Sequence, residues 1–271
     1  MDNDYTIDID KVLEAKAPKL KKWLPRFVVN YVKRIIHQDD INEFILRKRD
    51  VKGLAYADDI IEKFGAHVSV YGLENVPEDG RYIFASNHPL GGLDGMAFMH
   101  AVGKKYTKLK FPVNDILLYI KNFSDIFLPV NKVGTTGRRA AMLMEEAFAS
   151  DNQVLMFPAG LCSRKRGGKI VDLEWKKGFV SKAIQYERDI IPVHISGRNS
   201  DFFYNLSNLR TKLGIKANIE MLYLVDEMYK QHGQHIDVYF GKPISWQTLK
   251  GKKTQEIVAE IKKISYSLCD K

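Results

Sequence analysis

The sequence has few cysteines and no long uninterrupted run of apolar residues. Its two cysteines, Cys162 and Cys269, are too few for a disulfide framework and fit a reducing cytoplasm. Its apolar runs are far shorter than the roughly 20 residues that a membrane-spanning helix needs. The first residues, Met-Asp-Asn-Asp, lack the basic start of a signal peptide. We therefore expect neither a secreted disulfide-rich domain nor a membrane-spanning protein.

Motifs for metal and nucleic-acid binding are also missing. The possible ligands His88, Asp94, His100 and His194 show no His-Glu-x-x-His spacing and no Cys/His cluster, so we expect no metal site. The net charge of +9 would permit nucleic-acid binding, but no helix-turn-helix, zinc-finger or RNA-binding aromatic motif accompanies it. We therefore expect no nucleic-acid partner.

The patterning predicts an α/β protein. The chain of 271 residues, 45% hydrophobic and 28% charged, is long enough for an N-terminal helical segment over residues 1–65 and one α/β domain over 66–271. Strands alternating with helices indicate a mixed, largely parallel sheet flanked by helices. Predicted strands are 67–72, 81–86, 109–113, 126–130, 153–157, 190–195 and 235–240. Predicted helices are 8–17, 20–38, 40–48, 57–64, 94–104, 114–121, 136–150, 174–186 and 254–268. Residues 198–204 are expected to form a loop with aromatic anchors, followed by a short helix over 206–213.

The stretch from Ser86 to Gly95, with the sequence SNHPLGGLDG, carries the strongest chemical signal. It places His88 at the end of a buried strand and Asp94 at the start of a helix, with glycines between them. An imidazole that takes a proton from an alcohol or amine becomes a cation, and a carboxylate facing the imidazole stabilises that cation. Alone, the motif is also compatible with Asp94 as a helix N-cap. Ser86 lacks the Gly-x-Ser-x-Gly pattern of a hydrolase nucleophile.

Three later blocks extend this signal: Ile126 to Lys132, Val154 to Arg164, and Asp189 to Ile195. In order and spacing the four blocks resemble the glycerolipid acyltransferase superfamily, typified by the lysophosphatidate acyltransferases. That family has an Asn-His-x-x-x-x-Asp box, a strand ending in a substrate-binding Arg, a Phe-Pro-Glu-Gly box and a late Val-Pro strand. The resemblance covers residues 82–196, less than half of the chain.

The resemblance implies direct acyl transfer from a thioester, with no bound cofactor and no covalent enzyme intermediate. His88 is then the general base and Asp94 the residue that orients it. Acyl carrier protein or coenzyme A supplies the acyl group. The substrate-binding residues that it implies are Asn87, Asn131, Lys132, Arg138, Phe157, Pro158, Gly160, Ser163, Arg164 and Lys165.

Two departures separate this chain from the family pattern. One more residue lies between His88 and Asp94 than in the family box, and flexible glycines at 91 and 92 are expected to absorb it. Ala159 stands where the family has glutamate, and Asn131-Lys132 replaces the Arg-bearing strand end. The His88/Asp94 motif is retained, whereas the second and third blocks, which bind the acceptor in the family, differ. In this respect the chain resembles the subgroup that acylates lyso-amino-acid lipids.

Cations gather in two places. Arg164, Lys165, Arg166 and Lys169 form either a solvated loop or a site for a phosphate-bearing donor or an acidic carrier protein. Residues 19–36 contain six cations and no acid, with apolar residues at helical spacing. This segment is either a helix packed on the core or one that lies on an anionic membrane surface, with Pro25 favouring a break or a start.

The sequence therefore predicts an acyltransferase that transfers a fatty acyl group to a hydroxyl of a lysolipid. We expect it to be peripheral on the inner face of the cytoplasmic membrane. Its candidate partners are a lipid substrate and an acyl carrier protein, and nucleic acid is not expected among them. The alternatives are N-acylation of a small amine or amino acid by the same site, and a non-catalytic lipid-binding protein of this fold.

Overall fold

A seven-stranded sheet forms the centre of the molecule. Its strand order is β1-β9-β8-β2-β5-β3-β4, and every neighbouring pair is parallel except β8 and β9. The strands are β1 (His67–Tyr71), β2 (Tyr82–Ser86), β3 (Leu109–Val113), β4 (Phe127–Pro129), β5 (Gln153–Met156), β8 (Asp189–Ile195) and β9 (His235–Phe240). The predicted strands are all present, and the predicted fold class is confirmed.

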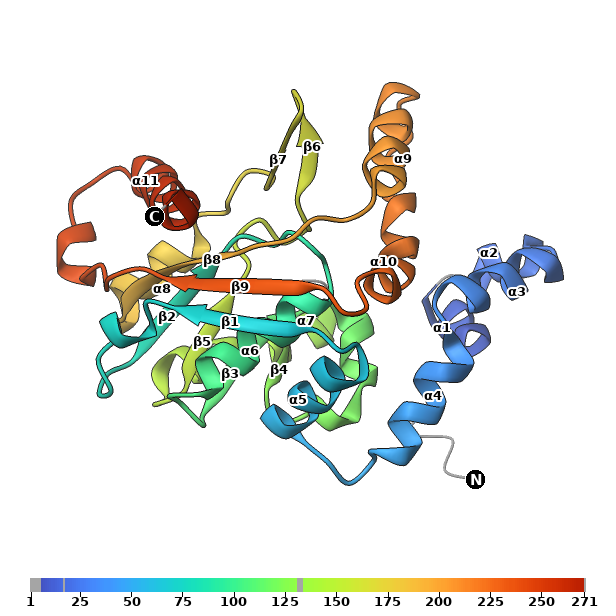
Figure 1. Cartoon of the computed structure of the whole chain (residues 1–271), viewed down its shortest axis with the longest axis horizontal. Coiled ribbons are helices and arrows are strands. Elements are labelled where there is room, and N and C mark those ends of the chain that lie inside the picture. The colour runs from blue at the N-terminus through green and yellow to red at the C-terminus, as the bar shows by residue number, and fades with distance from the viewer. Residues whose placement is uncertain (1–5, 17, 131–133, 271) are drawn as a thin grey trace.

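Helices cover both faces of this sheet, in the arrangement of Figure 1. They are α1 (Ile9–Lys16), α2 (Pro18–Trp23), α3 (Arg26–Ile35), α4 (Gln38–Arg47), α5 (Gly53–Lys63), α6 (Leu93–Gly103), α7 (Gly134–Ala149), α8 (Gly178–Tyr186), α9 (Asp201–Lys212), α10 (Leu224–Lys230) and α11 (Thr254–Ser267). Short 3₁₀ helices are η1 (Leu73–Asn75), η2 (Asp115–Tyr119), η3 (Lys121–Phe123), η4 (Ile219–Tyr223), η5 (Trp246–Leu249) and η6 (Leu268–Asp270). This computed structural model describes residues 6–16, 18–130 and 134–270.

Alternation along β2 divides the core into two layers. Tyr82 and Phe84 point to the layer formed with α5 and α6, whereas Ile83 and Ala85 point to the layer formed with α7, α8 and α11. All five residues of β2 are buried, as expected for a central strand covered on both faces. β2 therefore holds whatever follows Ser86 at a rigid central position.

The carboxyl ends of β2, β5 and β8 lie at one edge of the sheet, because these strands run parallel in adjacent positions. In such a sheet the loops beyond that edge are where sites form. Three motifs of the sequence follow these strand ends: the His88 turn after β2, the Phe157-Pro158 turn after β5, and residues 196–200 after β8. The fold brings together segments that are far apart in the chain.

Several local predictions were wrong. Residues 20–38 do not form one helix; α2 and α3 are separate, and the break that Pro25 favoured is present. Residues 115–119 form a 3₁₀ helix capped by Asn114 instead of an α-helix. The aromatic run after Arg198 was expected to be a loop, but α9 begins at Asp201, because the Ser200 side chain accepts a hydrogen bond from the Phe203 N–H. The hairpin of β6 (Arg164–Arg166) and β7 (Lys169–Val171) was not predicted.

The N-terminal helices and α9 extend outward from the sheet. In Figure 1, α1 to α4 project at the right, and α9 stands above α10 beside the β6–β7 hairpin. α5 differs from the helices before it, because its Tyr56, Ala57 and Ile61 belong to the main core. Within the described residues, no helix has the length and hydropathy needed to cross a membrane.

Candidate active site

His88 and Asp94 are in direct contact. His88 follows the end of β2, Asp94 lies in the first turn of α6, and the Nδ1 of His88 is 2.8 Å from the Oδ2 of Asp94. In the intervening turn, Gly91 has a φ of +84°, in the left-handed region that favours glycine. A Cβ at Gly91 would also lie only 2.7 Å from the Cδ2 of Leu224. Both geometry and space therefore require glycine here.

Asp94 is fully buried and is surrounded by hydrogen-bond donors. Its Oδ2 accepts the N–H groups of Leu90 (2.8 Å) and Gly91 (3.2 Å), and its Oδ1 accepts that of Gly95 (2.9 Å). Burial alone would raise the pKa of Asp94, but His88 and these backbone amides outweigh it and hold the pKa below its usual value. Asp94 is therefore an anion at neutral pH.

This anion determines the tautomer of His88. A carboxylate can only accept hydrogen bonds, so the Nδ1 of His88 carries the proton and its Nε2 has the free lone pair. The His88 side chain retains 16% of its accessible surface, whereas Asp94 has none. Asp94 thus orients the imidazole, and an imidazole paired in this way is suited to act as a general base.

The ring of His88 is also supported by Phe157. The two rings are stacked with centroids 3.9 Å apart and planes 13° from parallel. Phe157 in turn packs against Phe98 and Phe111, which belong to the core beside α6. The turn after β5 therefore contributes a wall that limits rotation of the imidazole.

Asp172 fixes the main chain around His88, and sequence reasoning missed it. Its Oδ1 accepts the His88 N–H (3.2 Å) and the Ser163 Oγ–H (2.6 Å), while its Oδ2 accepts the indole N–H of Trp175 (2.7 Å). The backbone N–H of Ser163 donates to the His88 carbonyl at 2.7 Å. The available signal was an acidic residue three positions before a tryptophan that needs an acceptor for its N–H.

Two residues predicted to bind substrate have their polar atoms occupied by the protein. Asn87 forms two hydrogen bonds with the backbone of Ile195, donating to its carbonyl and accepting from its N–H. These bonds join the ends of β2 and β8. Ser163 is buried, and its hydroxyl is used by Asp172 as described. Both residues support the turn that carries His88.

Arg164 lies inside the protein rather than on a basic loop. It is 4% exposed, its Nη1 donates to the carbonyl of Cys162, and its Nη2 donates to the Oε1 of Glu220 at 2.8 Å. Arg210 binds the other side of the same fully buried carboxylate. Burial alone would raise the pKa of Glu220, but the two arginines hold it below its usual value. Lys165 is paired with Asp201 at the surface.

The remaining predicted residues lie in different places. Pro158 is buried and Gly160 exposed in the turn after Phe157. Arg138 is exposed on α7, and no hydrogen bond or ion pair among the described residues connects it with His88. Asn131 and Lys132 lie outside the described residues. The structure thus brings His88, Asp94 and Phe157 together directly.

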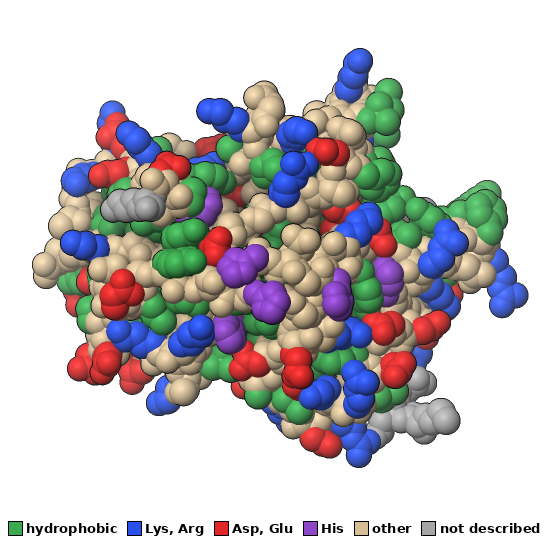
Figure 2. Space-filling view, in the orientation of Figure 1, with side chains coloured by type: hydrophobic (Ala, Val, Ile, Leu, Met, Phe, Trp, Pro, Cys, Tyr) green, Lys and Arg blue, Asp and Glu red, His purple; other side chains and the backbone are tan. Residues whose placement is uncertain are grey.

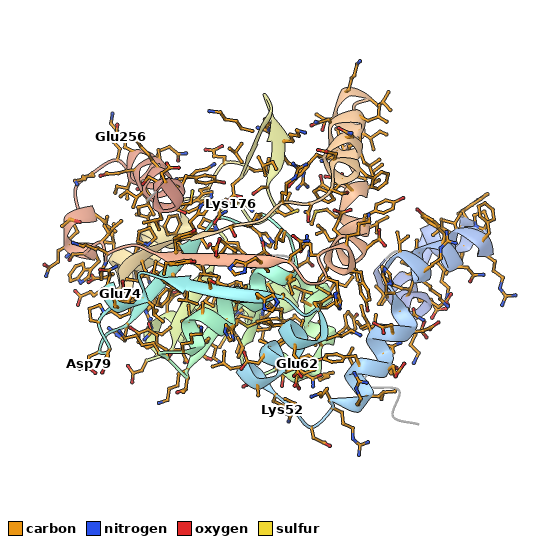
Figure 3. The ribbon with its side chains drawn as sticks, in the orientation of Figure 1. Lys52, Glu62, Glu74, Asp79, Lys176 and Glu256 are labelled. Atoms are coloured by element: carbon orange, nitrogen blue, oxygen red, sulfur yellow. The ribbon has the colours of Figure 1, made fainter. Side chains whose placement is uncertain are left out.

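Lys176 lies beside the turn at Gly160 and was not predicted. Its backbone N–H donates to the Pro158 carbonyl at 3.0 Å, and a Cβ at Gly160 would come within 2.9 Å of its Nζ. Figure 3 labels this exposed lysine, which forms no ion pair in the part of the chain that the structure describes. It brings a positive charge to the turn that carries Phe157.

Other nucleophiles fit this site poorly. The Oγ of Ser86 is buried and is directed to the Oδ1 of Asn87 at 3.3 Å. Cys162 is also buried, and its burial raises the pKa of the thiol to about 11, so it is protonated at neutral pH. The geometry thus favours a base acting on a bound acceptor.

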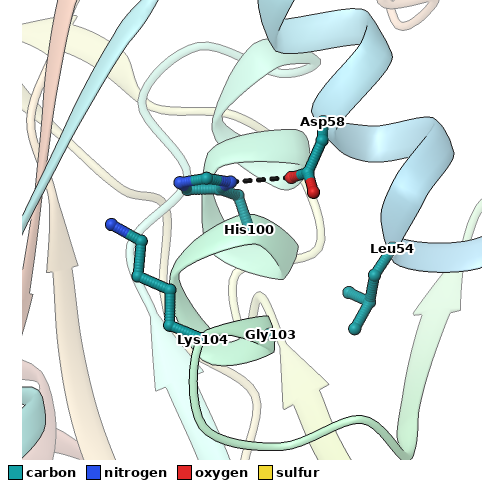
Figure 4. A pocket seen from close by; sticks show the side chains of 5 residues that line it. All are labelled: Leu54, Asp58, His100, Gly103 and Lys104. Carbon is teal, nitrogen blue, oxygen red and sulfur yellow. Dashed lines mark hydrogen bonds and ion pairs between the residues drawn. The ribbon is translucent and has the colours of Figure 1, made fainter.

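A second His–Asp pair provides a contrast. Figure 4 shows His100 of α6 bound to Asp58 of α5, with the His100 Nδ1 2.7 Å from the Asp58 Oδ1, in a pocket of about 200 Å³ lined also by Leu54 and Lys104. Asp58 is 57% exposed and lacks the backbone donors that surround Asp94. Among the described residues, no three His, Cys, Asp or Glu side chains form a potential metal site.

Comparisons with known proteins match nearly the whole chain. A family model described as acyltransferase matches residues 11–271. The chain is 49% identical over 269 residues to a lyso-glycine lipid O-acyltransferase of Bacteroides thetaiotaomicron, with 98% of this chain and 99% of that protein covered. It is 47% identical over 269 residues to a protein of the same name from Phocaeicola vulgatus, with coverages of 98% and 96%. Among solved structures, the 1-acyl-sn-glycerophosphate acyltransferase PlsC of Thermotoga maritima is similar, with 20% identity, a TM-score of 0.49, and 79% and 80% of the chains covered.

Proposed function

This chain belongs to the acyltransferase family, and from that premise we propose that it transfers a fatty acyl group from an acyl thioester to a hydroxyl of a lysolipid. The single observation that carries the proposal is the contact between His88 and the buried, ionised Asp94. The names of the two bacterial relatives favour a lyso-glycine lipid as the acceptor.

In the proposed mechanism, the Nε2 of His88 takes the proton of the acceptor hydroxyl as its oxygen attacks the thioester carbonyl. The imidazolium that forms is stabilised by Asp94 through the Nδ1–H. The tetrahedral intermediate then collapses with cleavage of the C–S bond, and the leaving sulfur receives the proton from Nε2. The products are an ester and a free thiol. A base positioned in this way contributes about 10²–10⁴ in rate.

The developing oxyanion needs a donor close to His88. Gly91 and Gly160 use their N–H groups on Asp94 and on the Phe157 carbonyl, respectively. For Gly92, no hydrogen bond of the N–H group is found in the described part of the chain. We therefore assign the oxyanion contact to the Gly92 N–H, next to the turn that positions the base.

The acceptor's anionic group is proposed to bind Lys176. A glycine attached through its amine keeps its carboxylate, and a lysine ammonium is a suitable partner for it. Lys176→Gln is expected to raise KM for the acceptor more than it lowers kcat. Lys177→Gln, which removes the same charge one residue away, is expected to change neither. Equal effects of the two substitutions would contradict this assignment.

The acyl donor is proposed to be acyl carrier protein or coenzyme A, with no cofactor held by the chain. Residues 19–36 are proposed to rest on the inner face of the cytoplasmic membrane. Two features of this segment support the second proposal: Trp23 is 85% exposed and Phe27 is 74% exposed, and the cations beside them suit anionic headgroups. We propose no nucleic-acid partner.

The decisive experiment is acyl transfer from a long-chain thioester into extracted membrane lipids, with products identified by mass spectrometry. Wild type is compared with His88→Gln, and His100→Gln is the matched control because it breaks a His–Asp contact of similar length outside the site. We expect a new O-acylated lipid with wild type and with the control only. Equal product from His88→Gln would refute the proposal, and an N-acylated amine would replace it with the alternative acceptor class.

A further inference from the structure

The outer side of α9 carries an apolar stripe that the core does not use. Phe202, Leu206, Leu209 and Leu213 recur at intervals of four, three and four, which places them on one helical face. Leu209 is 54% exposed and Leu213 is 65% exposed, whereas Tyr204 on the opposite face is fully buried. α9 thus has two apolar faces, one packed inside the protein and the other exposed to solvent. Contiguous exposed apolar surface of this kind marks an interaction site.

The stripe continues onto η4 and α3. Phe202 packs against Tyr223 with ring centroids 5.0 Å apart, and the Tyr223 hydroxyl forms a hydrogen bond of 2.9 Å with that of Tyr31 in α3. Leu222 is exposed beside them, and a shallow groove of about 610 Å³ along α3 is lined by Phe27 and Tyr31. Figure 2 shows hydrophobic side chains along the outer side of α9 and again at the projecting N-terminal helices.

Positive charge surrounds this stripe. Residues 202–219 include Arg210, Lys212 and Lys216 but no acidic residue. Arg210 is used by the buried Glu220, whereas Lys212 and Lys216 are exposed and have no ion pair within the described residues. An apolar helix face flanked by lysines complements anionic headgroups above acyl chains. The charge therefore favours a lipid surface over an uncharged protein face.

The segment that carries the stripe also covers the turn of the active site. Leu224 of α10 lies against Gly91, and the Sδ of Met228 would be 3.3 Å from a Cβ at Gly92. Glu220 of η4 is bound by Arg164, in the loop whose Ser163 is bonded to His88. A surface that contacts α9 is consequently close to Leu224 and Met228, the residues that cover the turn between His88 and Asp94.

We propose that α9 and η4 form a second membrane-docking surface, which seats on an anionic bilayer through Phe202, Leu209, Leu213 and Leu222. It adjoins residues 19–36 at Tyr31, extends the membrane contact beyond that segment, and brings the residues that cover the active site to the lipid surface. The choice of a bilayer as the occupant rests on the proposed lipid acceptor as well as on the free lysines beside the stripe.

The test is sedimentation of the full-length protein with phosphatidylcholine vesicles that contain or lack phosphatidylglycerol. Leu209→Gln/Leu213→Gln removes apolar surface without a charge change, and we expect roughly tenfold or greater loss of vesicle binding. Lys212→Gln/Lys216→Gln is expected to lose roughly fivefold per lysine, only with phosphatidylglycerol present. Asn205→Gln/Asn208→Gln changes exposed positions of α9 outside the stripe and is expected to bind within about twofold of wild type.

Binding does not require turnover, so the docking inference and the proposed function fail separately. The inference is overturned if the stripe variant, Leu209→Gln/Leu213→Gln, binds vesicles as the wild type does, or if the wild type does not bind vesicles. If the wild type does not bind vesicles but forms a dimer in ultracentrifugation, and the stripe variant is a monomer, the inference is overturned and the stripe instead binds a second copy of the chain. Loss of binding in the stripe variant supports docking even if no protein transfers acyl groups. If transfer occurs, this variant should keep its rate on a monomeric short-chain acceptor and lose it on vesicles.

Discussion

Asp94→Asn is the substitution that most directly probes the proposed chemistry, because it removes the charge and keeps the shape. All donors around Asp94 point toward its oxygens: Leu90, Gly91 and His88 toward Oδ2, and Gly95 toward Oδ1. An asparagine amide has one oxygen and one NH₂ group, so at least one donor must face another donor. Either orientation also leaves the imidazolium of His88 without an anion.

The expected loss of activity follows from these two effects. With the NH₂ toward His88, the ring adopts the other tautomer and Nε2 becomes a donor that cannot act as a base. With the oxygen toward His88, the tautomer survives but its cation loses stabilisation. A comparable Asp-to-Asn change in a serine protease lowers kcat about 10⁴-fold. We expect kcat to fall by about 10²–10⁴, which corresponds to about 3–5 kcal/mol of transition-state stabilisation.

The same substitution should change stability and its pH dependence. A buried donor left without an acceptor costs about 1–3 kcal/mol. The pKa of Asp94 is lower in the folded protein than its ordinary value of 3.8, so its ionised form stabilises the fold above the ordinary value. That contribution is lost as the pH falls through the lowered pKa. In urea titrations between about pH 7 and pH 3, Asp94→Asn should therefore lose less stability on acidification than wild type.

Initial rates of acyl transfer to a purified lysolipid measure the catalytic prediction, with Asp58→Asn as the control. Asp58 pairs with His100 at 2.7 Å but is exposed and distant in sequence from the His88 turn. Its substitution should change kcat by less than about twofold. Wild-type turnover by Asp94→Asn would refute the assignment of Asp94 as the group that orients the base.

Three further outcomes are expected. Gly91→Ala should lower kcat and reduce the free energy of unfolding by about 1–3 kcal/mol, because Gly91 has a positive φ and a leucine close by. Gly167→Ala, at a positive φ but in open space, should leave turnover unchanged. A thermal melt and initial rates test both variants. Asp172→Ala should destabilise the fold by roughly 3 kcal/mol, since it leaves the buried indole N–H of Trp175 without its acceptor and removes an acceptor of the His88 N–H and the Ser163 hydroxyl, and an unchanged urea midpoint would contradict this. In the native protein maleimide should label Cys269 and spare Cys162, with its pKa of about 11, and intact mass should show the second label only after denaturation.

Much of the fold could be predicted from the sequence because its strands are short apolar runs bounded by turn residues. The strands before and after the central β2 follow this pattern, and their predicted ends differ from the observed ones by at most one residue. The exception is the segment after β8. There the aromatic run of Phe202, Phe203 and Tyr204 indicated a loop, whereas the cap at Ser200 starts a helix. Local capping overrode the composition.

The site was predictable where residues are close in sequence and less so where contacts are distant. The spacing of His88 and Asp94 indicated a pair, and the structure places them in contact. The sequence could not indicate that Asp172, 84 positions from His88, accepts its backbone N–H. Nor could it distinguish a solvated Arg164 from one buried against Glu220, because both fates begin from the same basic run. Pairing over such separations depends on topology.

Because three backbone amides surround Asp94, the position of Asp94 depends less on His88 than the tautomer of His88 depends on Asp94. Leu90, Gly91 and Gly95 all belong to the turn and to the start of α6, so the anion is fixed by its own local chain. His88, by contrast, owes its tautomer to that anion. A chain that lost the histidine would therefore keep the amides that orient the carboxylate but would lose the largest contribution that holds its pKa low, whereas one that lost the carboxylate would keep a histidine without a defined tautomer. The aspartate therefore keeps its position without the histidine, whereas the tautomer of the histidine depends on the aspartate.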